Sequence, residues 1–509
     1  MKKRKVLITI ELLLCSLFLI LYVFSLLVFK KFDDISFEQL LYNIINSEGA
    51  DKTIVYQFSS YIIAVLICFF AFVYIKFEVY YSLKIKVLIN VVIKNKIIKI
   101  NPFKKTILKT ICFLFFIGFV SVYKSFDYLN LSEYIESQRT ASTIFEDYYV
   151  DGKSVDIKFP EEKRNLIYIY LESMESTNIS KTNGGIFEKS LIPNLEKIAL
   201  ENINFSNNNT IGGPIQLYNT GWTMAAIVAQ TSGIPLKVLD GNNYNNYSDS
   251  LPGVYNLGDI LYDNGYNNYF MIGSNADFAG RRDYFTSHGN YTIYDYLYAK
   301  QTNLIPNDYS VWWGYEDLKL FEFAKNKILE ASKSDKPFNF TLLTVDTHFT
   351  DGYMDSTCKN IFDNKYSNSI YCSDSKVGEF INWIKKQDFY DNTTIVIVGD
   401  HLTMQSNFYP KNDNYQRTMY NSFINVPFNF DNEKNRYFSS FDIFPTTLAS
   451  LGVQIEGDKL GLGVNLFSNK KTLLEDFGKE YLNTELAKKS FYYDNVILGD
   501  TYFEMNGLK

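Results

Sequence analysis

The sequence predicts an α/β protein in which N-terminal transmembrane helices precede a domain with a mostly parallel central sheet flanked by helices. Short β-rich runs alternate with helical patterns from residue 165 onwards, which is typical of a parallel sheet. Residues 1–126 hold 17 Lys and Arg against 7 Asp and Glu, a net of +10, so the remaining residues carry −16 and the two parts sum to the −6 of the whole chain. A basic, apolar front and an acidic body indicate a membrane anchor followed by a soluble domain.

Three apolar segments in the front part are candidates for membrane spans: Val6–Phe29, Ile54–Ile75 and Ile107–Tyr123. The third contains Lys109, whose long side chain can reach the membrane surface. Lysines and arginines gather before the first segment and between the second and the third, so the positive-inside rule places both regions in the cytoplasm and everything after the third span outside. The apolar, lysine-containing stretch Val87–Ile100 is expected to be an interfacial helix.

The chain therefore divides into four parts. Residues 1–125 form a membrane anchor with about three transmembrane helices, and residues 126–160 are a charged, Tyr-rich juxtamembrane linker. Residues 161–455 form the α/β domain, and residues 456–509 are a C-terminal extension expected to pack on that domain. The acidic balance of the body argues against nucleic acid as a partner, since binding to a phosphate backbone needs a basic surface.

The elements of the α/β domain follow from local patterns. The predicted strands are NLIYIYL (165–171), YFMIG (269–273), FNFTLLTV (338–345) and TIVIV (394–398). The clearest predicted helices are YEDLKLFEFAKNKILEA (315–331) and SKVGEFINWIKKQ (375–387).

The five cysteines fit this organisation. Cys15, Cys68 and Cys112 lie one in each predicted span, where cysteine behaves as a small apolar residue. Cys358 and Cys372 are an isolated pair in the exported part, which favours a disulfide over a metal site.

Chemically competent side chains follow several predicted strands. Ligands of open α/β sheets bind beyond the carboxyl ends of the strands, so these side chains are expected to gather at one edge. Carboxylates and imidazoles together suit a divalent cation such as Mn²⁺ or Zn²⁺, and an added hydroxyl and arginine suit phosphoryl chemistry. All three histidines are among them. The residues concerned are Glu172, Arg281, Arg282, Asp283, His288, Asp346, His348, Asp400 and His401.

Each of these residues has a structural alternative. Glu172 is compatible with a helix cap, Asp400 with a turn, and His288 with a packing histidine. The stretch NTGWTMAAIVAQTSG offers two threonines before a small apolar helix. One of them, Thr220 or Thr223, is expected to cap that helix, and a hydroxyl at a helix N-terminus is also favourably placed to become a nucleophile.

The motifs together resemble a known family. LES, TGWTMAAIVAQTSGIPL, RRD…HG, TVDTHF, VGDHLTM and FDIFPTTLASLGV are similar to the phosphoglycerol transferases that decorate periplasmic glucans (membrane-derived oligosaccharides). More broadly they resemble the lipoteichoic acid synthases of the alkaline phosphatase and sulfatase superfamily. The resemblance covers roughly residues 160–455 and implies an alkaline-phosphatase-like fold.

The resemblance also implies roles for individual residues. Thr220 is then the helix cap, and Gly221 lets the backbone approach the metal. The implied metal is one divalent cation, with Mn²⁺ first and Zn²⁺ or Mg²⁺ as alternatives. The RRD motif contains two arginines, and the resemblance gives the second, Arg282, the role of holding the substrate. The implied metal ligands are Glu172, Asp400 and His401, the nucleophile that also touches the metal is Thr223, and the substrate-holding residues are Arg282, His348 and His288.

The function implied by the resemblance is transfer of phosphoglycerol from phosphatidylglycerol to a cell-envelope glycan through a phospho-threonine intermediate. The acceptor would be a periplasmic glucan, a lipopolysaccharide or a capsule. The protein is then expected in the bacterial inner (cytoplasmic) membrane as a multi-pass protein, with its catalytic domain facing the periplasm or the cell exterior.

Three alternatives remain at this point. A phosphoethanolamine transferase or another phosphodiesterase of the superfamily would use the same scaffold, although a single cysteine pair argues mildly against the former. A sulfatase needs a C/S-x-P-x-R motif at the nucleophile, and Thr223 is followed by MAAI instead. A non-catalytic, membrane-anchored glycan-binding or sensory protein would be expected to have lost some of the ligands.

Overall fold

The structure of the protein is a computed structural model, which describes residues 2–32, 36–45, 52–81, 89–93, 96–100, 107–237, 251–410 and 414–499. Its contacts divide the chain into two compact units. The first unit comprises residues 1–37 and 51–133, and the second comprises residues 38–50 and 134–509.

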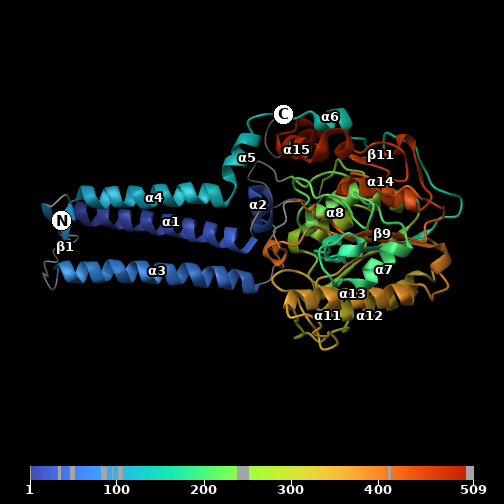
Figure 1. Ribbon diagram of the computed structural model, residues 1–509, viewed down its shortest axis with the longest axis horizontal. Helices are drawn as coiled ribbons and strands as arrows, with labels where there is room; N and C mark the ends of the chain where they lie inside the picture. Colours follow the sequence, from blue (N-terminus) through green and yellow to red (C-terminus); the bar gives the residue numbers. More distant parts are fainter. Residues whose placement is uncertain are drawn as a thin grey trace. The chain divides into compact units, whose positions relative to one another are not determined.

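Three helices make up most of the first unit: α1 (Lys2–Phe32), α3 (Lys52–Tyr81) and α4 (Ile107–Tyr128). Helix α1 contacts both α3 and α4 (Figure 1), and the rings of Phe29 and Tyr128 stack with centroids 4.8 Å apart. Among the described residues, one helix is long and apolar enough to cross a membrane, through its segment Leu13–Lys30.

The expected interfacial helix at residues 87–100 is not formed. The described part of this stretch is an antiparallel hairpin of β1 (Ile89–Ile93) and β2 (Lys96–Ile100). Isoleucine and valine make up most of both strands, and the strong β-propensity of these branched residues explains why the hairpin replaces a helix.

The second unit is built around a six-stranded sheet in the order β6-β5-β7-β4-β8-β9. All pairs are parallel except β8 and β9, so the predicted mostly parallel α/β fold is confirmed. The four predicted strands are its centre, and the edge strands β6 and β9 are not among the predicted ones. The strands are β4 (Asn165–Leu171), β5 (Asn267–Ile272), β6 (Thr292–Tyr294), β7 (Phe338–Leu343), β8 (Thr393–Gly399) and β9 (Asn421–Ile424).

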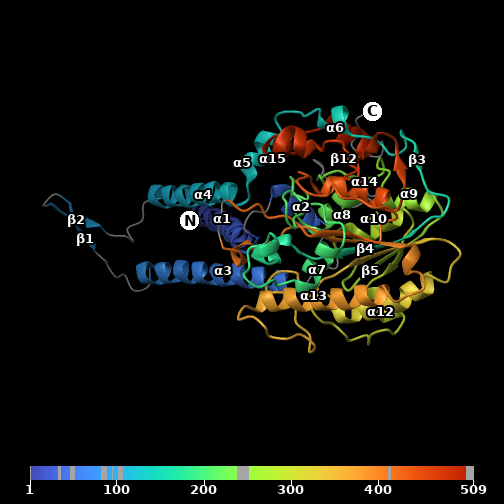
Figure 2. The same ribbon diagram turned by 45° about the vertical axis from the view of Figure 1, so that its right-hand side comes forward.

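Helices cover both faces of this sheet (Figure 2). In β4, Leu166, Tyr168 and Tyr170 join one hydrophobic core while the intervening Ile167 and Ile169 join the other, because successive side chains of a strand point to opposite faces. The first core is covered by α8 (Thr223–Ser232), α9 (Leu257–Asp263), α10 (Arg281–Ser287) and α14 (Ser440–Ser450), and the second by α7 (Pro193–Glu201), α12 (Asp317–Ala331) and α13 (Lys365–Ile384).

The segment predicted as a linker, residues 126–160, is largely part of the second unit. It contains α5 (Leu131–Ser137), α6 (Ile144–Tyr148) and β3 (Ile157–Lys158), which pairs with β10 (Gln454–Ile455). Its Phe145 is buried against Tyr493 with ring centroids 5.3 Å apart. The rings of Tyr149 and Tyr492 lie 5.4 Å apart, so the predicted linker makes aromatic contacts with the C-terminal part of this unit.

The C-terminal region also packs on the second unit. Helix α15 (Leu473–Ala487) starts with a capping box at Thr472 and buries Leu482 and Leu486. Short strands β11 (Lys459–Leu460) and β12 (Gly463–Val464) precede it, and α11 (Tyr296–Gln301) lies between β6 and α12 in the chain.

Candidate active site

The three predicted metal ligands meet at the carboxyl edge of the sheet. Strands β4 and β8 are paired in register, with Leu171 opposite Gly399, so that Glu172 and Asp400 leave the sheet side by side. One ligand atom from each of Glu172, Asp400 and His401 lies within 4.8 Å of the others. Nε2 of His401 is 3.5 Å from Oε1 of Glu172 and 3.4 Å from Oδ2 of Asp400.

The donor atoms of this cluster fit a divalent cation. Oδ1 of Asp400 accepts hydrogen bonds from the backbone amides of Ser173 (2.7 Å) and His401 (2.8 Å), whereas its buried Oδ2 has no hydrogen-bond partner among the described residues. Nδ1 of His401 lies 2.8 Å from the carbonyl oxygen of Leu402. Because a carbonyl can only accept, Nδ1 carries a proton, and in the neutral form of the ring Nε2 presents its lone pair to the cluster, as metal-binding imidazoles do.

The electrostatics of the cluster also favour a bound cation. Burial and the neighbouring Glu172 raise the pKa of Asp400 to about 7. Burial lowers the pKa of His401, but the carboxylates of Asp400 and Glu172 outweigh it and leave that pKa raised. Two buried carboxylates so close together repel each other, and a bound cation would relieve this repulsion.

We expect Asp400→Asn to weaken Mn²⁺ binding at least about 100-fold, since it removes a charged ligand of the buried cluster. Titration calorimetry of the full-length protein in detergent measures this. Asp388→Asn is the matched control, because it makes the same change at an exposed position. Equal Mn²⁺ affinity in the two variants would contradict a metal site at this cluster.

Thr223 is the first residue of α8 and faces the ligands. Its Oγ1 donates a hydrogen bond to Oε2 of Glu172 at 3.2 Å and lies 3.5 Å from Nε2 of His401. Gln230, on the same helix, donates to the carbonyl oxygens of Gly399 (3.2 Å) and Asp400 (3.3 Å), which fixes α8 against the end of β8. The threonine is therefore held between the cluster and the positive end of a helix.

The roles expected for Thr220 and Gly221 differ from those in the structure. Trp222 is the N-cap of α8, while Thr220 closes the preceding turn by donating to the carbonyl oxygen of Leu217 at 2.9 Å. A Cβ at Gly221 would lie 2.5 Å from Nε2 of Gln216. Gly221 thus makes room for a side chain whose Oε1 accepts from the amide of Leu402 at 3.0 Å.

The structure turns Arg281, and not Arg282, towards the cluster. Arg282 is held by two carboxylates, with Nε on Asp277 and Nη2 2.6 Å from Oδ2 of Asp295. Arg281 is 5 % exposed, and its buried Nε has no hydrogen-bond partner among the described residues. Burial lowers the pKa of Arg281 to about 10, and the charges of Glu172 and Asp400 act against this shift, so its guanidinium stays charged at neutral pH.

His288 does not join the cluster. Its Nδ1 lies 2.7 Å from Oδ2 of Asp259 on α9, and its ring lies 5.2 Å from that of Tyr284. This agrees with the packing role that the sequence left open as the alternative to substrate binding.

His348 lies close enough to Glu172 and Arg281 to interact with both charges. Its Nδ1 donates to the carbonyl oxygen of Phe349 at 2.7 Å, and burial lowers its pKa, so the imidazole is neutral with Nε2 as an acceptor. The ring of Trp313 lies 4.6 Å from that of His348 and 5.5 Å from that of Phe278. Sequence reasoning had not assigned these aromatic neighbours to the site.

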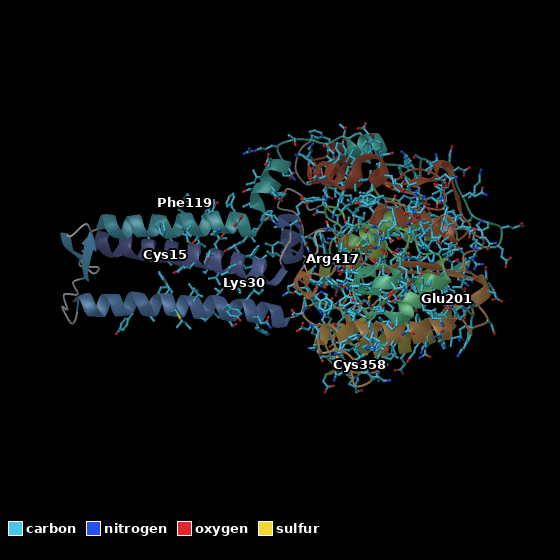
Figure 3. The ribbon with its side chains drawn as sticks, viewed as in Figure 1. Cys15, Lys30, Phe119, Glu201, Cys358 and Arg417 are labelled. Carbon is cyan, nitrogen blue, oxygen red and sulfur yellow. A yellow bond between two sulfur atoms is a disulfide. The ribbon has the colours of Figure 1, made fainter. Side chains whose placement is uncertain are left out.

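Two flanking loops are held by buried ion pairs. Glu175 accepts from the amide of Thr403 (2.9 Å) and from Nε of Arg417 (2.9 Å), which fixes the loop after His401; Figure 3 labels Arg417. On α13, Lys376 pairs with Asp346 at 2.8 Å, which fixes the start of the loop that carries His348.

The same loop is closed by a disulfide between Cys358, labelled in Figure 3, and Cys372 on α13. We expect the double variant Cys358→Ser/Cys372→Ser to lose about 3 kcal/mol of unfolding free energy, since a loop of this size gives that much chain-entropy stabilisation. Denaturant unfolding of the full chain measures it. A reductant is expected to lower wild-type stability and to leave the double variant unchanged; equal stability of all forms would contradict the prediction.

The site thus combines two carboxylates, an imidazole and a threonine hydroxyl at the carboxyl edge of a mostly parallel sheet. The chain belongs to the sulfatase family, whose profile matches residues 164–453. The family name does not fix the reaction, because the residues from Thr223 onwards, TMAAI, are not the C/S-x-P-x-R motif that a sulfatase needs at its nucleophile.

Several relatives are named phosphoglycerol transferase I. That of Citrobacter koseri is 36 % identical over 287 residues, which cover 54 % of this chain and 35 % of the relative. That of Xanthomonas campestris pv. campestris is 32 % identical over 252 residues, which cover 48 % of this chain and 34 % of the relative. The match thus spans about a third of the length of these relatives.

Solved structures with similar folds include the lipoteichoic acid synthase LtaP from Listeria monocytogenes. It gives a TM-score of 0.48 at 20 % identity, and the match covers 64 % of this chain and 81 % of that one. A second similar structure is that of the integral membrane protein lipooligosaccharide phosphoethanolamine transferase A from Neisseria meningitidis. Its TM-score is 0.40 at 15 % identity, and the match covers 69 % of this chain and 71 % of that one.

Proposed function

We propose that the protein is a membrane-anchored phosphoglycerol transferase that moves phosphoglycerol from phosphatidylglycerol to a cell-envelope glycan through a phospho-threonine intermediate. The observation that carries the proposal is the Thr223 hydroxyl, which lies at the N-terminus of α8 and within reach of Glu172 and His401. The names of the relatives support the transferred group.

The reaction has two steps that balance. Oγ1 of Thr223 attacks the donor phosphorus, the new P–O bond forms, and the bond between phosphorus and the diacylglycerol oxygen breaks. The hydroxyl proton ends on diacylglycerol. An acceptor hydroxyl then attacks the same phosphorus, the bond to Thr223 breaks, and the acceptor proton returns to Thr223.

Three further groups act on the substrate. The Arg281 guanidinium, buried with an unused Nε, neutralises charge on the phosphoryl oxygens. Nε2 of the neutral His348 accepts a hydrogen bond from a hydroxyl of the glycerol or of the acceptor. The first amides of α8 face the region where negative charge develops.

One divalent cation would be held by Glu172, Asp400, His401 and the Thr223 hydroxyl, with Mn²⁺ as first choice and Zn²⁺ or Mg²⁺ as alternatives. When bound, it supplies Lewis acidity that lowers the pKa of a hydroxyl and stabilises the charged transition state. Oδ2 of Asp400, which has no hydrogen-bond partner among the described residues, supports this assignment.

The rival functions are less well supported. All four positions of the cluster hold competent residues, which a non-catalytic binding or sensory protein would not need. A phosphoethanolamine transferase would use the same geometry, so only the donor separates it from the proposed activity.

The proposal places the enzyme in a bacterial inner membrane with its site facing the periplasm or cell exterior. Helix α1 meets the requirements of length and apolarity, and the proposed anchor adds α3 and α4 as second and third spans. The acceptor is proposed to be a periplasmic glucan, a lipopolysaccharide or a capsule.

The test is incubation of the purified full-length protein with fluorescent phosphatidylglycerol in detergent micelles. We expect diacylglycerol release with Mn²⁺ and its loss with a chelator, followed by recovery on adding the metal back. Release from phosphatidylethanolamine alone would move the protein to the rival transferase class. No release from either lipid by metal-loaded protein would contradict the proposed reaction.

A further inference from the structure

Helix α2 (Phe37–Ile45) lies between α1 and α3 in the sequence, but its residues from Glu38 onwards belong to the second unit. The Tyr42 hydroxyl donates a hydrogen bond to the carbonyl oxygen of Ala279 at 2.8 Å, and the Tyr42 ring lies 6.1 Å from that of Trp222. Glu38, 3 % exposed, accepts a hydrogen bond from Nδ2 of Asn219. In Figure 2, α2 lies to the left of α8.

These contacts fall on the two loops that carry the reacting groups. Asn219 and Trp222 lead directly into Thr223 at the start of α8, and Ala279 lies shortly before Arg281 at the start of α10. The side chains of a single short helix therefore touch both the nucleophile loop and the arginine loop.

Two of the contacted residues have a strained backbone. Asn219 has φ +54° and Ala279 has φ +58°, in the left-handed region that non-glycine residues rarely adopt. Such conformations persist only where the surroundings over-determine them, and they gather at functional sites. Asn219 donates its hydrogen bond to Glu38, and Ala279 accepts one from Tyr42, so α2 helps to hold both residues in place.

We infer that α2 is a brace of the active site, in which Glu38 and Tyr42 are positioning residues that hold the Thr223 loop and the Arg281 loop in their mutual geometry. This inference rests on the proposed function for the reaction it serves. The segment between the first two helices of the anchor then contributes to turnover without touching substrate. Displacing a reacting group by a fraction of its contact distance lowers the rate strongly, since reaction needs near-attack geometry.

The test compares variants of the full-length protein in detergent. We expect Tyr42→Ala to lower kcat for phosphatidylglycerol about 10-fold or more while KM changes less than about 2-fold, because orientation and not binding is lost. Tyr42→Phe keeps the ring on Trp222 and is expected to lose at most about 10-fold, the value of one hydrogen bond. Ile44→Ser, an exposed position of the same helix, is the matched control and keeps wild-type kcat.

A second pair of variants separates hydrogen bonding from charge. Glu38→Gln retains an oxygen that can accept from Asn219 and is expected to keep most of the activity. Glu38→Ala removes the acceptor and is expected to behave like Tyr42→Ala. Equal losses in Gln and Ala variants would overturn the positioning role, because a charge effect would then explain both.

Hydrogen–deuterium exchange gives a readout that does not depend on turnover. We expect faster exchange of the amides in residues 219–224 and 276–282 in Tyr42→Ala than in Ile44→Ser. Unchanged exchange in both segments would overturn the brace, whatever happens to kcat. Faster exchange in a protein whose wild type turns over neither lipid would support the brace and refute the proposed function.

Discussion

Thr223→Ala is expected to lower the rate of diacylglycerol release at least about 1,000-fold, because the variant lacks the proposed nucleophile and with it the proposed covalent step. Thr223→Ser is expected to retain a measurable rate, since it keeps a hydroxyl at the start of α8. The threonine contacts Glu172 and His401 at the surface of the cluster, so its removal leaves the two carboxylates and the imidazole in place.

The intermediate gives an independent measurement. Acid-quenched wild-type protein incubated with phosphatidylglycerol and no acceptor is expected to carry a glycerophosphoryl group on the peptide that contains Thr223, as seen by mass spectrometry. Thr220→Ala is the matched control, since Thr220 only closes the preceding turn and its variant is expected to carry the group. Undiminished release by Thr223→Ala, or a label on another residue, would disprove the threonine mechanism.

Arg281→Lys is expected to lower kcat about 100-fold, with little change in the free energy of unfolding. Lysine keeps the charge but cannot reproduce the planar fork that binds two phosphoryl oxygens. Arg282→Lys is expected to show the opposite balance: an activity close to wild type and a stability lower by about 1–3 kcal/mol, because Arg282 joins Asp277 to the buried Asp295.

Steady-state kinetics and denaturant unfolding of both arginine variants decide between these assignments. Since the two positions are adjacent and the substitution is identical, each variant is the control for the other. A large loss of kcat in Arg282→Lys with full stability, together with an active Arg281→Lys, would restore the assignment made from the sequence.

Much of the fold was predictable from short patterns. The central strands β4, β7 and β8 are buried along almost their whole length, so their sequences are rich in apolar residues and stand out between polar loops. The juxtaposition of Glu172, Asp400 and His401 was equally predictable, because parallel strands end at the same edge of a sheet. The short edge strands β6 and β9 offered too few residues for such a pattern.

Other features depend on partners that are distant in the sequence. Adjacent residues of a helix point about 100° apart, so only one of Arg281 and Arg282 can face the cluster, and the carboxylates that hold the second arginine decide which. His288 contacts Asp259 on α9 instead of the cluster. The role of α2 had no local signal, since its partners Asn219 and Ala279 are far along the chain.

The place of α2 also constrains how the chain threads a membrane. Because α2 contacts the loops that carry Thr223 and Arg281, it must be on the same side of any membrane as the catalytic sheet. The chain between them therefore crosses an even number of times, and an anchor in which α3 crosses without α4 is excluded. In the proposed three-span anchor, α3 and α4 are the two crossings between α2 and the sheet, which satisfies this requirement. The positive-inside rule predicts the same arrangement, with the lysine-rich link between α3 and α4 on the opposite side from the site.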